Sequence, residues 1–364
     1  MGILDTIIET HQKESLQQFE LNLIISKILD PLKNREQTIL AKRYGLKGEE
    51  LQTLKTVGEE QGLTRERVRQ IEKDLLKNLK RGVQELESFT TARDLLLNTV
   101  TEHGGIMSEK TLLDYLGIDS EQEANAIKFL LNLVIELEEH EEDKHIKQSW
   151  HRLGFDKEFL REFITTTKDL LENHGKPLHT DEFIGKFKKS EFHKKYESQL
   201  TPRVIINFLN TAAGVHKNPF GEFGLHHWNE IHPKDVGDKA YLVMKHHGKP
   251  EHYSAITDLI NHHSLDKRTA YKETVHNKLI KDKRFVLVGR GMYALAEWGY
   301  KPGVVSDIIV SVLKDGAKPL SREEIIEAVL LRRMVKKNTI LVGLSNKKLF
   351  KKVGKNLYTL AESK

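Results

Sequence analysis

The most informative pattern of apolar and polar positions lies between residues 53 and 79, in the stretch TLKTVGEEQGLTRERVRQIEKDLLKNL. Its second half repeats apolar residues at helical spacing, which predicts a helix with one inward face. Thr53 and Thr64 suit the N-caps of two helices, and Gly62 suits a tight turn between them. The stretch therefore predicts a helix at 53–60, a turn, and a second helix at 65–79. The apolar face of the second helix comprises Val68, Ile71, Leu75, Leu76 and Leu79.

The opposite side of the second predicted helix is polar and charged. Glu66, Arg69, Gln70 and Lys73 recur there at i, i+3, i+4 and i+7, with Arg65 in the first turn. Such side chains suit the major groove of DNA, because Arg can bond guanine bidentately, Gln adenine, and Glu can accept from cytosine. A solvated face, with Glu66 paired to Arg69 or Gln70, is the alternative that the pattern leaves open.

Residues 32–79 resemble the C-terminal promoter-reading region of primary-type bacterial sigma factors. The resemblance rests on the Arg35-Glu36 pair, RYGL at 43–46, Thr53-Leu54, and TRERVRQIE at 64–72. Gln61 departs from the family, which usually has an apolar or aromatic residue there, so the first helix is expected to pack less firmly.

The resemblance implies roles for individual residues. The side chains expected to contact base edges of the upstream promoter hexamer are Arg65, Glu66, Arg69 and Gln70. Those expected to contact the DNA backbone are Arg35, Arg43, Thr64 and Lys73.

Residues 1–30 have the pattern of an amphipathic helical lead-in, with Leu16, Phe19, Leu23, Ile24 and Ile28 on one side, and Pro31 interrupts it. This stretch lacks the aromatic sequence that sigma factors use to melt DNA strands. We therefore expect that the chain does not open a promoter by itself.

After residue 86 a pattern repeats at intervals of about 70 residues, which is typical of tandem modules. Each copy has a glycine-containing turn between apolar helices, a third helix, and then two alternating strands. The strands are clearest at 284–298 and 349–360, with turns at 289–291 and 354–356; a counterpart is expected at 220–228. Three helices and a terminal hairpin predict four winged helices in tandem.

The Lys-Pro turn and the hairpin with its closing Trp resemble the HARE-type winged-helix family, which includes the N-terminal domain of the bacterial RNA polymerase delta subunit. Residues 239–300 match best. The resemblance implies DNA binding or docking on the transcription machinery. The expected fold is mainly α: a lead-in at 1–30, a sigma-like helix-turn-helix at 31–87, and winged helices at 88–151, 152–236, 237–301 and 302–364.

Charge distinguishes the four copies. Residues 91–150 carry 5 Lys and Arg against 13 Asp and Glu, whereas residues 151–238 carry 13 of each. The balance is 11 against 6 in 239–300 and 14 against 6 in 301–364. An acidic surface repels phosphate, so the first copy is expected to dock a protein and the last two to approach DNA.

The basic residues expected to contact the DNA backbone in the last two copies are Arg290, Lys336, Lys337, Lys351, Lys352 and Lys355. Contacts of this kind add affinity and salt dependence without selecting sequence. For each lysine taken singly, ordinary solubilisation of the surface is an equally good interpretation.

The composition argues against several classes of protein. There is no cysteine, which excludes disulfides and thiol nucleophiles, and no apolar run has the length of a membrane span. The chain lacks HExxH, a phosphate-binding loop and a nucleophile elbow, and its adjacent histidine pairs rarely chelate one metal. We expect no enzyme activity, cofactor, metal, membrane or small-molecule substrate, and a cytoplasmic, nucleoid-associated location.

These observations favour a sequence-specific DNA-binding transcription protein whose partners are double-stranded DNA and RNA polymerase. Two alternatives stay open. One is a polymerase-docking adaptor without sequence preference, and the other is a DNA-binding accessory module of a restriction or repair system.

Overall fold

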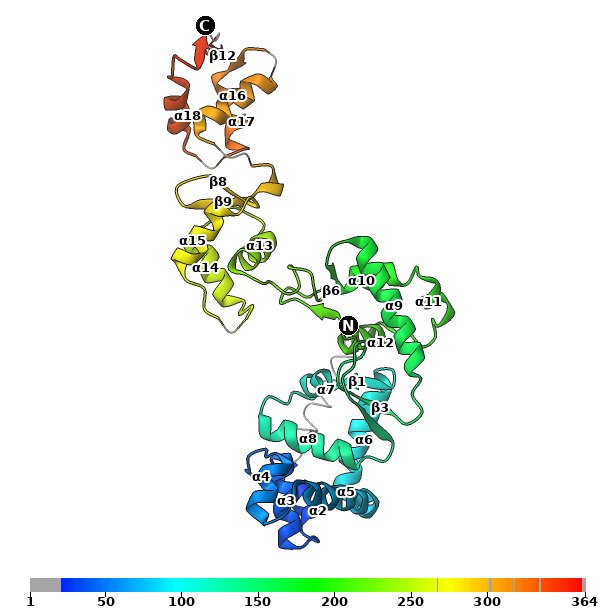
Figure 1. The fold of residues 1–364 in the computed structure, drawn as a ribbon. Coiled ribbons are helices and arrows are strands. Elements are labelled where there is room, and N and C mark those ends of the chain that lie inside the picture. The colour runs from blue at the N-terminus through cyan, green and yellow to red at the C-terminus, as the bar shows by residue number, and fades with distance from the viewer. Residues whose placement is uncertain (1–20, 267, 301–302, 317, 334, 362–364) are drawn as a thin grey trace. The chain divides into compact units, whose positions relative to one another are not determined.

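A computed structural model describes residues 21–266, 268–300, 303–316, 318–333 and 335–361 (Figure 1). The chain divides into two compact units. Unit 1 extends to Lys217 and includes Gly221–His226, and unit 2 comprises Asn218–Phe220 and the residues from His227 onward.

Four helices form the N-terminal segment of unit 1: α2 (Leu21–Leu29), α3 (Asn34–Tyr44), α4 (Leu54–Gln61) and α5 (Arg65–Gly82). The helix pair predicted from residues 53–79 is confirmed, although α5 continues three residues further. The lead-in helix is described only from Leu21, and Leu16 and Phe19 of its predicted apolar side lie outside the described residues. A short 3-10 helix, η1 (Val83–Glu85), follows α5.

Four repeats follow, each with the order helix, strand, helix, helix, strand, strand. Repeat 1 consists of α6 (Glu87–Glu102), β1 (Ile106–Ser108), α7 (Glu109–Leu116), α8 (Glu121–Leu133), β2 (Leu137–His140) and β3 (Ser149–Arg152). Repeat 2 consists of α9 (Lys157–His174), β4 (Leu178–His179), α10 (Thr180–Phe187), the additional short α11 (Glu191–Lys195), α12 (Pro202–Thr211), β5 (Val215–Lys217) and β6 (Glu222–Leu225).

Repeat 3 consists of α13 (Val236–His247), β7 (Glu251–His252), α14 (Tyr253–His262), α15 (Lys272–Lys281), β8 (Phe285–Leu287) and β9 (Met292–Leu295), followed by η2 (Ala296–Trp298). Repeat 4 consists of α16 (Val305–Asp315), β10 (Leu320–Ser321), α17 (Arg322–Leu330), α18 (Lys337–Leu344), β11 (Phe350–Lys352) and β12 (Leu357–Leu360).

Each repeat contains one three-stranded antiparallel sheet. The last strand lies in the centre and pairs with both others, giving the orders β1-β3-β2, β4-β6-β5, β7-β9-β8 and β10-β12-β11. The strand between the first two helices is only two or three residues long, so it has no visible alternation and was not predicted. The hairpin of repeat 2 begins at Val215 rather than near Phe220, where the sequence placed it.

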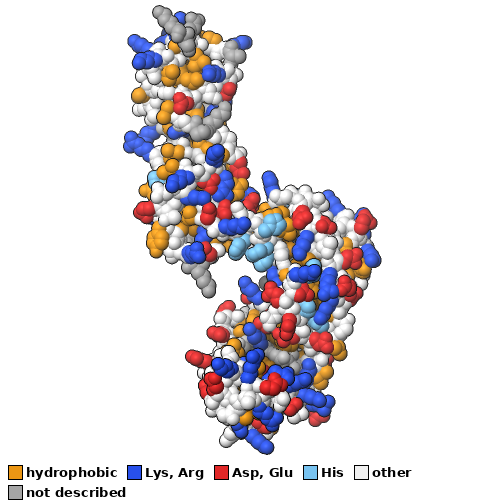
Figure 2. Space-filling model, viewed as in Figure 1, with side chains coloured by type: hydrophobic (Ala, Val, Ile, Leu, Met, Phe, Trp, Pro, Cys, Tyr) orange, Lys and Arg blue, Asp and Glu red, His pale blue; other side chains and the backbone are white. Residues whose placement is uncertain are grey.

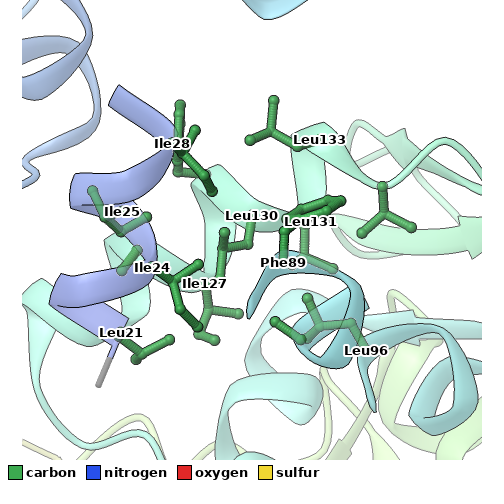
Figure 3. Close-up of a cluster of buried hydrophobic side chains, with 14 of the residues drawn as sticks. Leu21, Ile24, Ile25, Ile28, Phe89, Leu96, Ile127, Leu130, Leu131 and Leu133 are labelled. Atoms are coloured by element: carbon green, nitrogen blue, oxygen red, sulfur yellow. The ribbon is translucent and has the colours of Figure 1, made fainter. Parts of the chain in front are cut away.

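The N-terminal segment and repeat 1 share a single apolar core. The third helix of repeat 1, α8, packs against α2, α3 and α5, and Figure 3 shows Leu21, Ile24 and Ile28 of α2 beside Ile127 and Leu130 of α8. The rings of Tyr44 and Phe129 meet edge to face, with centroids 5.2 Å apart. Each such fully buried aliphatic or aromatic side chain contributes about 1.5 to 3 kcal/mol.

Repeat 2 joins repeat 1 through polar contacts as well as apolar ones. The side-chain amide of Asn207 on α12 donates to the carbonyls of His103 (2.7 Å) and Ile106 (2.5 Å). The hydroxyl of Thr211 accepts from the backbone N–H of Ser108 at 3.3 Å. Gly104, at φ +91°, leaves room for α12, because a Cβ there would lie 2.7 Å from Val204. The third helix of repeat 2 is therefore an internal interface.

The loop between β2 and β3 completes this interface. Ile146 forms a β-bridge with Ala212 at the end of α12. The ammonium group of Lys147 donates to the carbonyls of Asn210 (2.9 Å) and Val215 (3.2 Å). Burial disfavours the charged form and, together with the nearby positive charge of Lys110, lowers the pKa of Lys147 to about 8.

Repeats 3 and 4 of unit 2 each have an apolar core of their own. In repeat 3 the core includes Val275 and Leu279 of α15 beneath Tyr293 of β9. In repeat 4 it includes Ile340 and Leu344 of α18 beside Phe350 of β11. In both repeats the third helix buries only one side.

We expect Asn207→Ala to lower the free energy of unfolding of unit 1 by about 2 kcal/mol, because it leaves two buried carbonyls without their donor. The matched control is Asn277→Ala on α15, the third helix of repeat 3, where the asparagine is exposed; its effect should stay below about 0.5 kcal/mol. Denaturant unfolding of the full chain checks both values. Equal effects of the two substitutions would contradict the buried role of Asn207.

Lys147 should make stability depend on pH. Its pKa in the folded chain, about 8, lies below the ordinary lysine value of 10.5, so the ammonium destabilises the fold most below pH 8. This penalty disappears as pH rises from 8 to 10.5, because the lysine becomes neutral in both states. The unfolding free energy of the parent minus that of Lys147→Met should rise across this window by up to about 3 kcal/mol. Parallel pH profiles for the two proteins would contradict the assignment.

Candidate nucleic-acid interface

The α4–α5 helix pair is fixed by local signals at its caps and turn. The hydroxyl of Thr53 accepts from the backbone N–H of Thr56, and that of Thr64 from Arg67, each at 3.2 Å. Gly62 ends α4 at φ +64°, a left-handed conformation that glycine adopts without strain. These contacts set where α5 begins, and so which side chains occupy its first turn.

A small core holds the two helices together. Val57 of α4 and Val68 of α5 are fully buried against Ile39 of α3. Gly58 permits this approach, since a Cβ at that position would lie 2.7 Å from the carbonyl oxygen of Leu63. The apolar side of α5 thus faces inward, as its spacing predicted, and the N-terminal half of its other side faces solvent.

The residues predicted to contact bases lie together on that exposed side. Glu66 accepts two hydrogen bonds from the guanidinium of Arg69, at 2.9 and 2.6 Å, and its carboxylate lies 3.5 Å from the amide of Gln70. Arg65 is exposed beside them. Hydrogen bonding to Arg69 lowers the pKa of Glu66, and the same contact raises the pKa of Arg69. The pairing that the sequence left open as an alternative is therefore present in the chain without DNA.

The predicted backbone contacts of the N-terminal segment have different environments. Lys73 is exposed on α5, whereas the hydroxyl of Thr64 caps that helix. Arg35 is exposed and donates to the carbonyl of Gln61 at 2.6 Å. Arg43 is the most enclosed.

The guanidinium of Arg43 joins three parts of the segment. It donates to the carboxylate of Glu72 at 3.0 Å and also to the carbonyl of Gln52. Its side chain is 21% exposed, and its bond to Glu72 helps to hold α3 against α5. A contact of Arg43 with DNA stays a prediction.

Arg67 is a neighbour that the sequence analysis did not include. It is exposed on α5, and its guanidinium donates to the side-chain oxygen of Gln70 at 3.3 Å. In the sequence, its position in the first turn of the predicted helix was the signal that could have identified it as part of the cluster.

Repeat 4 has lysines at the N-terminal end of α18, on β11 and in the adjacent turns. Lys336 and Lys337 precede or begin α18, Lys351 and Lys352 lie on β11, and Lys355 lies in the hairpin turn. All five are exposed, and no Asp or Glu occurs between Lys336 and Tyr358. On the side of this repeat visible in Figure 2, Lys and Arg side chains outnumber Asp and Glu.

Lys347 and Lys348 extend this basic surface and were missed by the sequence analysis. Both are exposed in the turn that joins α18 to β11. They lie between the predicted third helix and the predicted hairpin, in a segment for which no DNA contact was predicted.

Repeat 3 uses several of its cations internally. Lys278 pairs with Asp235 at 2.7 Å, and Arg284 pairs with Asp282 (2.6 Å) and Asp238 (2.8 Å). Arg290, the predicted backbone contact, is exposed in the turn between β8 and β9.

The described residues contain neither a membrane-spanning helix nor a metal-binding cluster. No helix of that part of the chain has the length and apolarity needed to cross a membrane. Within the same residues, no group of three or more His, Asp and Glu side chains has an arrangement that could hold a metal ion.

Comparison with known proteins agrees with the geometry of the N-terminal segment. Residues 28–81 match the family model for sigma-70, region 4. The chain is 42% identical over 79 residues to the RNA polymerase principal sigma factor HrdD of Streptomyces griseus, covering 21% of this chain and 24% of that protein. It is 38% identical over 80 residues to the RNA polymerase sigma factor SigA of Nostoc, covering 21% and 20%.

A plant protein gives a similar result. The RNA polymerase sigma factor sigB of Arabidopsis thaliana is 41% identical over 56 residues, which are 15% of this chain and 10% of that protein. The chain thus spans a quarter or less of the length of each of these relatives. The resemblance inferred from TRERVRQIE is confirmed: a sigma-70 region 4 is found at residues 28–81 of this chain.

Proposed function

We propose that this chain is a sequence-specific DNA-binding transcription protein, in which residues 28–81 recognise a promoter-like element. The observation that carries the proposal is the cluster of Arg65, Glu66, Arg69 and Gln70, exposed at the start of α5 within a sigma-70 region 4. The chain acts by binding and not by catalysis.

The cluster has the chemistry of direct base recognition. A guanidinium can donate two hydrogen bonds to the major-groove edge of guanine, and a carboxylate can accept from the amino group of cytosine. In the chain without DNA, Glu66 and Arg69 satisfy one another. Binding exchanges this exposed pair for base contacts, and because an exposed ion pair stabilises a fold little, little is lost in the exchange.

The four repeats are, in this proposal, winged helices of the HARE type. Support comes from their common element order and from the sheet order in which the last strand is central. The lysines of repeat 4 contact phosphates of the DNA backbone that flanks the recognised element. Because they select no sequence, they add affinity and salt dependence.

RNA polymerase is the proposed protein partner, since the relatives matched by residues 28–81 are named as its sigma factors. The surplus of acidic residues in repeat 1, 13 against 5 basic over residues 91–150, favours a second candidate function. In that function the chain is a polymerase-docking adaptor without sequence preference, because an acidic surface repels DNA and suits a basic protein surface.

Arg69→Ala should reduce discrimination between the preferred duplex and an unrelated one by about 1 to 3 kcal/mol, because a bidentate base contact is lost. Lys77→Ala is the matched control, an exposed cation further along the same helix. Fluorescence anisotropy with both duplexes gives the difference. If Arg69→Ala bound each duplex as well as the parent does, base recognition by α5 would be refuted and the adaptor function favoured.

The double substitution Lys351→Ala with Lys352→Ala should weaken binding to all duplexes alike. The slope of log Kobs against log salt should become shallower by up to about 2, because each phosphate contact releases about 0.9 counterion. Lys188→Ala with Lys189→Ala, an exposed adjacent pair in repeat 2, is the control and should leave the slope unchanged. An unchanged slope in the repeat 4 variant would remove these lysines from the interface.

A further inference from the structure

A pocket with a volume of about 1060 Å³ lies within unit 1, between repeat 1 and repeat 2. Its walls come from the start of α7, the β2–β3 loop, the end of α12 and strand β5. These elements are held together by the Ile146–Ala212 bridge and by the bond between Ser108 and Thr211. The pocket is therefore part of a fixed interface, and its volume is comparable with that of the larger small-molecule sites.

Lys147 lines this pocket, and its ammonium group is only partly satisfied by the protein. Two of its three N–H donors bond the carbonyls of Asn210 and Val215. Among the described residues, no acceptor is bonded to the third donor. Carbonyl oxygens carry only partial charge, and charges removed from water are normally paired with an opposite charge. The site thus lacks an anion that would complete it.

The charges that act on Lys147 increase this need for an anion. Lys110, in the first turn of α7, disfavours the ammonium more strongly than Glu142 of the β2–β3 loop favours it, and both residues line the pocket. Glu109, a second carboxylate of the lining, is already paired with Lys128 at 2.8 Å. An anion that enters the pocket would therefore be attracted by two ammonium groups at once.

Two imidazoles belong to the same lining. The rings of His216 on β5 and His226 after β6 have centroids 4.6 Å apart and are inclined by 45°. An imidazole N–H can donate to a phosphate oxygen, and the ring can pack against a planar organic group. The remaining titratable groups of the lining are Lys217, Asp114 and Tyr115.

We propose that this pocket binds a small organic phosphate, with Lys147 and Lys110 as the groups that hold the phosphate. A phosphate dianion matches two ammonium groups in charge and accepts hydrogen bonds from both. Because the pocket is much larger than one phosphate group, the ligand has an organic part, which packs beside His216 and His226. The ligand is an effector and not a substrate. It stabilises the interface between repeats 1 and 2, because it binds only the folded chain.

Isothermal titration calorimetry of the full chain at pH 8 tests the site, with sulfate, inorganic phosphate and adenosine monophosphate as probes. Sulfate exchanges no proton at this pH, so a proton taken up on sulfate binding goes to the protein. With a pKa of about 8, Lys147 is half neutral under these conditions, and a bound anion favours its charged form. Sulfate binding should take up about half a proton, which titrations in buffers of different ionisation enthalpy measure.

Three substitutions separate the roles of the lysines. Lys110→Ala, at an exposed position, should weaken the binding of all three probes roughly tenfold. Lys147→Arg keeps a permanent charge, so it should still bind sulfate but lose the proton uptake. The matched control is Lys144→Ala, which is exposed in the same loop but does not line the pocket, and it should behave as the parent. Circular dichroism verifies that the variants are folded.

The absence of binding by every probe at millimolar concentration would overturn the proposal. Parent-like affinity of Lys110→Ala, or undiminished proton uptake by Lys147→Arg, would do the same. Displacement of sulfate by a DNA duplex would make the pocket a DNA-backbone contact instead, and equal affinity for phosphate and adenosine monophosphate would contradict the organic part of the ligand. Because the inference does not depend on DNA recognition, Arg69→Ala should leave sulfate binding unchanged, so the two proposals can fail separately.

Discussion

The packing of α8 against α2, α3 and α5 is the contact on which unit 1 depends. The N-terminal segment consists of four helices, and a unit of this size buries only a modest apolar surface by itself. Sharing a core with repeat 1 adds to that burial. The same contact holds the apolar side of α5 in place, so that Arg65, Glu66, Arg69 and Gln70 project from a rigid support.

This contact also commits repeat 1 to a structural role. A third helix that packs against another part of the chain cannot also present the same side to solvent. The third helices of repeats 1 and 2 pack in this way, with Phe129 and Leu130 buried in one and Asn207 and Thr211 in the other. The third helix of repeat 3 exposes Thr274 and Asn277. One architecture, repeated four times, thereby serves packing in unit 1 and leaves these side chains exposed in unit 2.

The sequence predicted those features that local patterns encode. The helical spacing of Val68 and Leu75 predicted α5, and Thr64 predicted where that helix begins. The short strands β1, β4, β7 and β10 were not predictable, because two or three residues show no periodicity and are fixed only by pairing with a distant strand. The shared core was equally hidden. Nothing in the spacing of Ala126 and Phe129 says that they share a core with Ile28 and Leu40, since that choice is made by tertiary packing.

For the candidate site, residue type predicted the cluster on α5, and it left the pairing of Glu66 with Arg69 or Gln70 open as an alternative. The bonds from Arg69 to Glu66 and from Arg43 to Glu72 depend on side-chain conformation, which the sequence does not reveal.

The most direct test of DNA recognition by α5 is selection of bound duplexes from a random pool by the intact chain, followed by sequencing. The account predicts enrichment of one short motif, with guanine at a position whose preference disappears when Arg69 is replaced. A recovered pool with no sequence preference would contradict it.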